Sequence, residues 1–192
     1  MKSKSRIAIF ASGSGTNAEE IMKHFKHYPA VEVVLLLSNN PTAYALERAK
    51  KFAIPSRVFN KTQFRESDEV LQWLEEFKVT HIVLAGFLWL IPKNLIARFP
   101  DKIINIHPAL LPKYGGKGMY GAKVHEAVKE SGDKESGISI HLVNEHYDEG
   151  GILFQARCEV NSADTPETIA AKIHKLEYEH FPKEIEKWIG NA

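Results

Sequence analysis

The stretch "RIAIFASGSGTNAEEIMKHF", residues 6–25, decides the fold of this chain. Its first part, residues 6–12, is a short apolar run that is typical of a buried strand. A glycine-containing turn leads from it into residues 18–28, where Ile21 and Phe25 recur at helical spacing. A strand, a glycine loop and a helix in this order predict the first βα unit of a parallel sheet.

Short apolar runs and helical patterns continue to alternate through the first two-thirds of the chain. The run at residues 31–38 is too continuously apolar for a strand with one wet face, as expected in a parallel sheet. The expected strands and helices that follow the first unit cover residues 31–38, 43–53, 54–60, 67–77, 81–87 and 102–106. This order predicts an α/β fold: an open, mostly parallel, Rossmann-like twisted sheet with helices on both faces.

The pattern changes in the last third of the chain. A helical pattern covers residues 121–130, and two strand-like runs follow at residues 136–145 and 151–160. Because only a short turn separates the two runs, they predict an antiparallel hairpin that extends the sheet at its C-terminal side. A final helix is expected to begin after Thr165, its N-cap, and Pro182 is expected to kink or interrupt that helix.

Length and composition limit the class of protein. The chain has 192 residues and a net charge of +1, which predicts one domain over residues 1–192, with halves at residues 1–100 and 101–192. The chain has no excess of basic residues that would indicate nucleic-acid binding, and no apolar run approaches the length of a membrane span. The single cysteine, Cys158, excludes an internal disulfide. We therefore expect a cytoplasmic protein that binds neither nucleic acid nor membrane.

The glycine loop fits an anion-binding site. Residues 13–18 match the G-x-G-x-x-A pattern of dinucleotide-binding proteins, whose glycines let the backbone approach a phosphate. The second strand, however, ends in Ser-Asn-Asn at residues 38–40, without the carboxylate that would bind a nicotinamide cofactor's ribose. We therefore expect a site for one phosphate, with Thr16 and Asn17 as additional donors. The structural alternative is a tight turn in which Asn17 caps the helix.

Two polar residues end the buried run "IINIH". Asn105 and His107 are two positions apart, so an extended chain places their side chains on the same side. An amide can donate to a developing oxyanion, and an imidazole can move a proton near neutral pH. The pair therefore fits acyl transfer, although a histidine at a strand end is more often structural.

The expected hairpin turn offers three carboxylates for this pair: Glu145, Asp148 and Glu149. The flanking Gly150 and Gly151 permit a bend that aims a carboxylate back at the sheet. A plain turn residue is the alternative for Asp148, and a half-buried strand residue is the alternative for His141. No spacing of cysteine and histidine resembles a zinc site, so we expect no metal.

The chain resembles the folate-dependent glycinamide ribonucleotide transformylases, the phosphoribosylglycinamide formyltransferase family. The resemblance rests on "ASGSGTN", "VLAGFLWLIP", "NIHPALLPKYGGKG", "SGISIHLVNEHYDEGGILFQ" and "KLEYEHFP", which occur in family order over nearly the whole chain. The patterns N-I-H-P-x-L-L-P and D-x-G-x-I-L-x-Q are specific to folate-using formyltransferases, but not to one acceptor.

The resemblance implies transfer of a formyl group from 10-formyltetrahydrofolate to the amine of glycinamide ribonucleotide in purine biosynthesis, without an acyl-enzyme. It implies a phosphate-binding first half and a catalytic, folate-binding second half, and a monomer or a homodimer. The catalytic positions are Asn105, His107 and Asp148. The first two would stabilise the oxyanion, and Asp148 would keep His107 charged and help to move the proton.

The resemblance also implies two sets of binding residues. Those for the ribonucleotide are Gly15, Thr16, Asn17, Arg65 and Glu177. Those for the folate are Leu88, Trp89, Leu90, Ile91, His141 and Val143, with Phe87 beside them. Many family members have Met-Arg in place of Leu88-Trp89. This difference affects the contacts that hold the glutamate tail of the folate.

Other functions remain open at this point. A formyltransferase for another amine or a 10-formyltetrahydrofolate hydrolase would share the same core. A silent nucleotide- or folate-binding module would not need Asn105, His107 and Asp148 together. A nicotinamide oxidoreductase is disfavoured by the missing ribose carboxylate.

Overall fold

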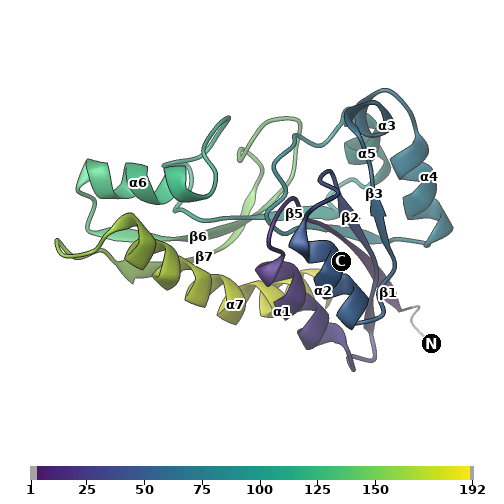
Figure 1. Cartoon of the computed structure of the whole chain (residues 1–192), viewed down its shortest axis with the longest axis horizontal. Helices are drawn as coiled ribbons and strands as arrows, with labels where there is room; N and C mark the ends of the chain where they lie inside the picture. The colour runs from purple at the N-terminus through teal and green to yellow at the C-terminus, as the bar shows by residue number, and fades with distance from the viewer. Residues whose placement is uncertain (1–3, 191–192) are drawn as a thin grey trace.

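A computed structural model describes residues 4–190 of the chain (Figure 1). Seven strands and seven helices alternate along most of it. The strands are β1 (Ser5–Phe10), β2 (Val31–Ser38), β3 (Ser56–Val58), β4 (His81–Leu84), β5 (Ile103–His107), β6 (Glu135–Leu142) and β7 (Ile152–Glu159). The helices are α1 (Thr16–Phe25), α2 (Tyr44–Lys51), α3 (Lys61–Arg65), α4 (Glu69–Glu76), α5 (Lys93–Arg98), α6 (Ala122–Ser131) and α7 (Pro166–Gly190).

All seven strands form one sheet in the order β3-β2-β1-β4-β5-β6-β7. The first five pair in parallel, while β6 pairs antiparallel with both β5 and β7. The predicted mostly parallel sheet and its antiparallel extension are therefore confirmed. The chain runs outward from β1 to β3 and then returns to β4 on the other side of β1. This reversal leaves a crevice at the carboxyl ends of β1 and β4, where ligands bind in such sheets.

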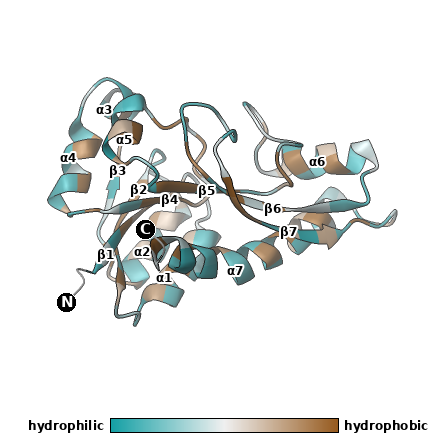
Figure 2. Cartoon of the chain, turned by 180° about the vertical axis from the view of Figure 1, so that it is seen from behind, coloured by the Kyte–Doolittle hydropathy of each residue, from teal (hydrophilic) through white to brown (hydrophobic). Residues whose placement is uncertain are grey.

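Helices cover both faces of the sheet, as predicted. In β1, Ile7 and Ile9 pack into a cluster with α1, α2 and α7, whereas Ala8 and Phe10 pack into a second cluster with α3, α4 and α5. Successive side chains of a strand point to opposite faces, so one short apolar run supplies both cores. The strands near the centre of the sheet are accordingly coloured as hydrophobic in Figure 2.

Some expected elements differ in the structure. The strand expected at residues 81–87 ends at Leu84, because the chain bends at Ala85 and Gly86, and Gly86 has a positive φ of 72°. The short helices α3 and α5 were not expected, since five and six residues give little periodicity. The expected interruption of the last helix is not observed: α7 continues through the buried Pro182. Thr165 does cap it, by accepting from the Thr168 N–H at 3.3 Å.

His81 makes the stability of the fold depend on pH. Its side chain is 5% exposed, packs edge-on against Trp188 at 4.9 Å, and burial lowers its pKa from 6.5 to about 4. Between these two pKa values, His81 is therefore protonated in the unfolded chain but neutral in the folded chain. We expect stability to be full above about pH 6.5 and to fall by up to about 3 kcal/mol as the pH drops toward 4. Urea unfolding of the wild type and of His81→Gln at several pH values checks this. In the variant, the free energy of unfolding should lose the part of its pH dependence that His81 causes.

Candidate active site

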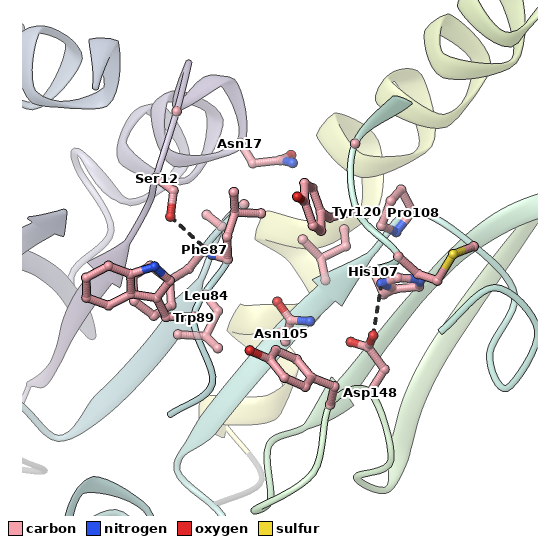
Figure 3. Close-up of a pocket in the computed structure, with 18 of the residues that line it drawn as sticks. Ser12, Asn17, Leu84, Phe87, Trp89, Asn105, His107, Pro108, Tyr120 and Asp148 are labelled. Atoms are coloured by element: carbon pink, nitrogen blue, oxygen red, sulfur yellow. Dashed lines mark hydrogen bonds and ion pairs between the residues drawn. The ribbon is translucent and has the colours of Figure 1, made fainter. Parts of the chain in front are cut away.

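A cavity of about 650 Å³ opens at the carboxyl ends of β1, β4 and β5 (Figure 3). The glycine loop after β1 and the segment after β4 form two of its walls. The end of β5 and the loops before α6 and β7 form the others, and α7 contributes two residues. The described lining comprises residues 12–17, 84–91, 105–108, 116–121, 125, 141, 143, 146–148, 174 and 177.

The structure brings almost all of the predicted site residues to this one cavity. They come from segments up to 162 positions apart in the sequence, yet they face the same space. The predicted residues that line it are Gly15, Thr16, Asn17, Leu88, Trp89, Leu90, Ile91, Asn105, His107, His141, Val143, Asp148 and Glu177. The exception is Arg65, which lies exposed at the end of α3 and does not line the cavity.

His107 ends β5 with only 4% of its surface exposed. Its Nε2 lies 2.7 Å from the Tyr114 carbonyl oxygen, and because that oxygen can only accept, Nε2 carries a hydrogen. Its Nδ1 faces Asp148 Oδ2 at 3.6 Å, as the dashed line in Figure 3 shows. Burial lowers the pKa of His107, and the Asp148 charge is the largest influence that raises it. Both ring nitrogens thus face acceptors, an arrangement that fits the charged imidazolium.

Asp148 is held in place from several directions. The Gly116 N–H donates to its Oδ2 at 2.9 Å, and His141 Nε2 lies 3.5 Å from its Oδ1. Burial raises the pKa of Asp148, but the neighbouring rings of His141 and His107 and the Gly116 N–H together bring it below the usual value. Its backbone has a positive φ of 58°, which is strained for a residue other than glycine. Because its pKa lies below the usual value, Asp148 is a carboxylate at neutral pH.

Asn105 and His141 lie opposite each other on β5 and β6. The Nδ1–H of His141 donates to the Leu142 carbonyl at 2.7 Å, which leaves Nε2 to face the Asn105 amide. The Asn105 Nδ2 amide is 3.1 Å from that atom and donates to it. One amide hydrogen is thereby directed, while the other has no protein partner between residues 4 and 190. Asn105 thus presents an oriented donor to the cavity.

The glycine loop brings backbone amides to the other end of the cavity. Gly15 has a φ of 72° and directly precedes α1, so the free N–H groups of the first helical turn, beginning at Thr16, face this space. Such a helix start attracts anions, which supports the predicted phosphate site. The Asn17 cap that the structural alternative required is not observed, since α1 has no side-chain cap.

Replacing Gly15 with alanine should destabilise the protein. A Cβ at this position would lie 2.5 Å from the Ala45 Cβ, and the positive φ would add strain. We expect a loss of about 1–3 kcal/mol, as for overpacking of a well-packed site, together with weaker phosphate binding. Urea unfolding measures the loss, and Gly13→Ala is the matched control because a Cβ there meets nothing within 4 Å. Equal stability of the two variants would contradict this account of the loop.

Glu177 is a carboxylate at the end of the cavity formed by the start of α1. It is only 5% exposed on α7. Its Oε2 accepts from Asn17 Nδ2 at 3.0 Å and lies 2.9 Å from His174 Nδ1. The hydrogen bond to Glu177 raises the pKa of His174. A buried carboxylate would repel a phosphate placed directly against it, but it can accept hydrogen bonds from hydroxyl or amine groups.

The segment after β4 forms an apolar wall. The Trp89 ring packs against Phe59 and Phe64 with centroids 6.0 and 5.9 Å away, so the aromatic cluster under the sheet supports the wall. Leu88 is 45% exposed beside it. The wall thus offers a flat apolar surface for a ring system.

Some residues that line the cavity or support its side chains were not predicted from the sequence. Tyr114 and Gly116 act through main-chain atoms, and the only signal for them is the glycine-rich "KYGGKG" after His-Pro. His125 on α6 is 4% exposed, and its Nδ1 has no partner in the described part of the chain. Burial lowers its pKa, so His125 is neutral at pH 7 and offers one free ring nitrogen near the phosphate end.

Comparison with known proteins agrees with this geometry. The formyl transferase family matches residues 5–185 of the chain. A phosphoribosylglycinamide formyltransferase of Bacillus subtilis is 37% identical over 96% of this chain and 95% of the relative. A chloroplastic phosphoribosylglycinamide formyltransferase of Arabidopsis thaliana is 43% identical over 90% of this chain, which spans 63% of that relative's length.

Solved structures show the same fold. The crystal structure of phosphoribosylglycinamide formyltransferase from Bacillus halodurans superposes with a TM-score of 0.85 at 36% identity, over 95% of this chain and 94% of the other. The family match covers almost the whole chain, and the relative from Bacillus subtilis is covered nearly end to end. The chain therefore belongs to the phosphoribosylglycinamide formyltransferase family of formyl transferases.

Proposed function

We propose that the protein transfers the formyl group of 10-formyltetrahydrofolate to the amine of glycinamide ribonucleotide, yielding N-formylglycinamide ribonucleotide and tetrahydrofolate. The observation that carries this proposal is the cluster of Asn105, His107 and Asp148 at the middle of a cavity with two different ends. One end is a helix start suited to a phosphate, and the other is an apolar wall suited to a pterin.

The ribonucleotide is proposed to bind at the helix start. Its phosphate would accept from the amides of Gly15, Thr16 and Asn17, while Glu177 would bind the ribose hydroxyls or the amine. Arg65 remains a weaker candidate for a phosphate contact, since it would have to reach in from outside the cavity. This orientation places the amine between the phosphate end and the catalytic cluster.

The formyl donor is proposed to bind against Leu88, Trp89, Leu90 and Ile91, with His141 and Val143 opposite. The wall is apolar, and main-chain groups beside it can pair with the polar edge of the ring. Between residues 4 and 190 no group of three histidine, cysteine, aspartate or glutamate side chains could hold a metal ion. The proposed reaction needs none, because protein donors supply the positive charge.

The amine is proposed to attack the formyl carbon directly. The carbonyl electrons move to oxygen, and the free amide hydrogen of Asn105 and a protonated His107 beside Asp148 stabilise that oxyanion. The bond from the formyl carbon to the folate nitrogen then breaks. Asp148 keeps His107 charged and helps to pass the proton from the attacking amine to the leaving nitrogen.

Replacing Asn105 with alanine should lower kcat by about 100- to 1000-fold, the usual cost of losing one oxyanion donor. The KM values should change little, because the interaction forms only in the transition state. Mass spectrometry of N-formylglycinamide ribonucleotide formed by the wild type and the variant measures this and tests the proposed product. Asn94→Ala, an exposed asparagine of α5 outside the cavity, is the matched control. An Asn105 variant with the wild-type rate would contradict the assigned role.

The proposed site of this reaction is the cytoplasm. No helix within residues 4–190 is long and apolar enough to cross a membrane. The substrates are small, charged and water-soluble molecules, which supports an aqueous compartment. The protein is proposed to act as a monomer or a homodimer.

A further inference from the structure

The apolar wall after β4 has very few internal restraints. The last ladder contacts of this strand are the Ala85 N–H with the Phe10 carbonyl and the Gly86 carbonyl with the Ser12 N–H. Beyond them, residues 87–91 belong to no helix or strand. Within the described part of the chain, their main-chain groups make two hydrogen bonds, and both go to side-chain hydroxyls.

The first hydroxyl belongs to Ser12, which precedes the glycine loop. Its Oγ accepts from the Leu88 N–H at 3.1 Å and donates to Asn39 Oδ1 at 2.7 Å. The hydrogen bond to Asn39 therefore fixes the orientation of the hydroxyl. Ser12 is 7% exposed, and its backbone N–H also holds the Gly86 carbonyl at 3.0 Å. Figure 3 shows Ser12 and its hydrogen bond at the edge of the cavity. Ser12 therefore fixes the wall to the phosphate-binding loop.

The second hydroxyl belongs to Tyr147, the neighbour of Asp148. It accepts from the Leu90 N–H at 3.1 Å across the cavity from β4. Its own hydrogen has no acceptor in the described part of the chain. Tyr147 therefore fixes the same wall to the loop that carries Asp148.

We propose that Ser12 and Tyr147 are positioning residues for the formyl donor, which together clamp the segment 87–91 through its amides at Leu88 and Leu90. With these two amides taken by the protein, the remaining main-chain donors and acceptors of the segment are offered to the polar edge of the ring in a fixed frame. The clamp joins the phosphate loop, the donor wall and the catalytic carboxylate, so it sets the distance between the two substrates. The proposal rests on the proposed function, since it assumes that the donor binds at this wall.

The variants Ser12→Ala and Tyr147→Phe remove one hydroxyl each and leave the remaining side chain in place. Each should weaken binding of tetrahydrofolate by about 2- to 10-fold, the value of one net hydrogen bond. Because either loss frees the same segment, the double variant should lose less than the product of the two single losses. Affinity for glycinamide ribonucleotide should stay within about twofold, and the pH profile of kcat should not move. Isothermal titration calorimetry with each compound measures the affinities.

The matched controls are Ser56→Ala in β3 and Tyr44→Phe in α2, both exposed and outside the cavity. If the wild type binds tetrahydrofolate and both single variants bind it with the same affinity, the clamp is overturned but the proposed function is not. Losses that multiply in the double variant would also overturn it, since they would indicate two independent contacts. A wild type that binds no tetrahydrofolate would contradict the proposed function and the clamp together.

Discussion

Replacing His107 with alanine is expected to lower kcat by about 100- to 10,000-fold, the range for loss of a general acid–base. The ring lies two positions from Asn105 on β5, and its Nδ1 is 3.6 Å from Asp148 Oδ2, so the carboxylate balances the charge whenever the ring is protonated. Without it, the oxyanion would lose one of its two proposed partners, and the proton transfer would lose the imidazole. Steady-state kinetics with glycinamide ribonucleotide and 10-formyltetrahydrofolate measure the loss.

The fold must survive for this result to be meaningful, because His107 is buried. His107→Asn keeps a polar side chain in the same space and should be as inactive as the alanine variant, while circular dichroism shows native secondary structure. His27→Ala replaces an exposed histidine outside the cavity and should leave turnover unchanged. An active and folded His107 variant would remove this residue from the mechanism.

Asp148→Asn is expected to reduce turnover by a similar factor and also to shift the pH profile. The pKa of His107 is already lowered by burial, and Asp148 is the strongest influence that opposes this effect. Removing the carboxylate charge lowers that pKa further, so a smaller fraction of His107 is protonated at neutral pH. If activity needs the imidazolium, it is lost as the pH rises through the pKa of His107. The alkaline fall of kcat/KM should therefore move to lower pH in the variant.

Asp101→Asn is the matched control for this substitution. Asp101 is exposed and has a positive φ of 56°, close to the 58° of Asp148, so both variants make the same backbone demand. Its pH profile should coincide with that of the wild type. A profile of Asp148→Asn that keeps its alkaline limb in the wild-type position would show that Asp148 does not sustain the charge of His107.

The central part of the site was predictable because it depends on local sequence. The run at residues 6–12 and the two glycines that follow it, Gly13 and Gly15, specify β1, the loop and the start of α1 within one short stretch. Asn105 and His107 fall on one side of β5 by the two-residue period of a strand. The position of both features at strand ends then follows from the parallel sheet.

Other features depend on contacts between distant segments, which no local pattern records. Glu177 is buried because α7 packs beside α1, where Asn17 meets it 160 positions away. The hydroxyl of Tyr147 finds the Leu90 amide only after the two loops are folded. The Tyr114 contact uses a carbonyl oxygen that any residue could supply, so residue identity gives no signal. Arg65 shows the opposite case, where resemblance alone predicts a role and the structure places the side chain outside the cavity.

The most direct test of the proposed function is the release of tetrahydrofolate from 10-formyltetrahydrofolate, measured with and without glycinamide ribonucleotide. We predict release only when the ribonucleotide is present, because in the proposed mechanism its amine is the nucleophile and both substrates bind in the same cavity. Release at the same rate without the ribonucleotide would indicate a hydrolase and contradict the account. An absence of release in both reactions would contradict it as well, and would point to a different acceptor amine or to a protein that binds without catalysis.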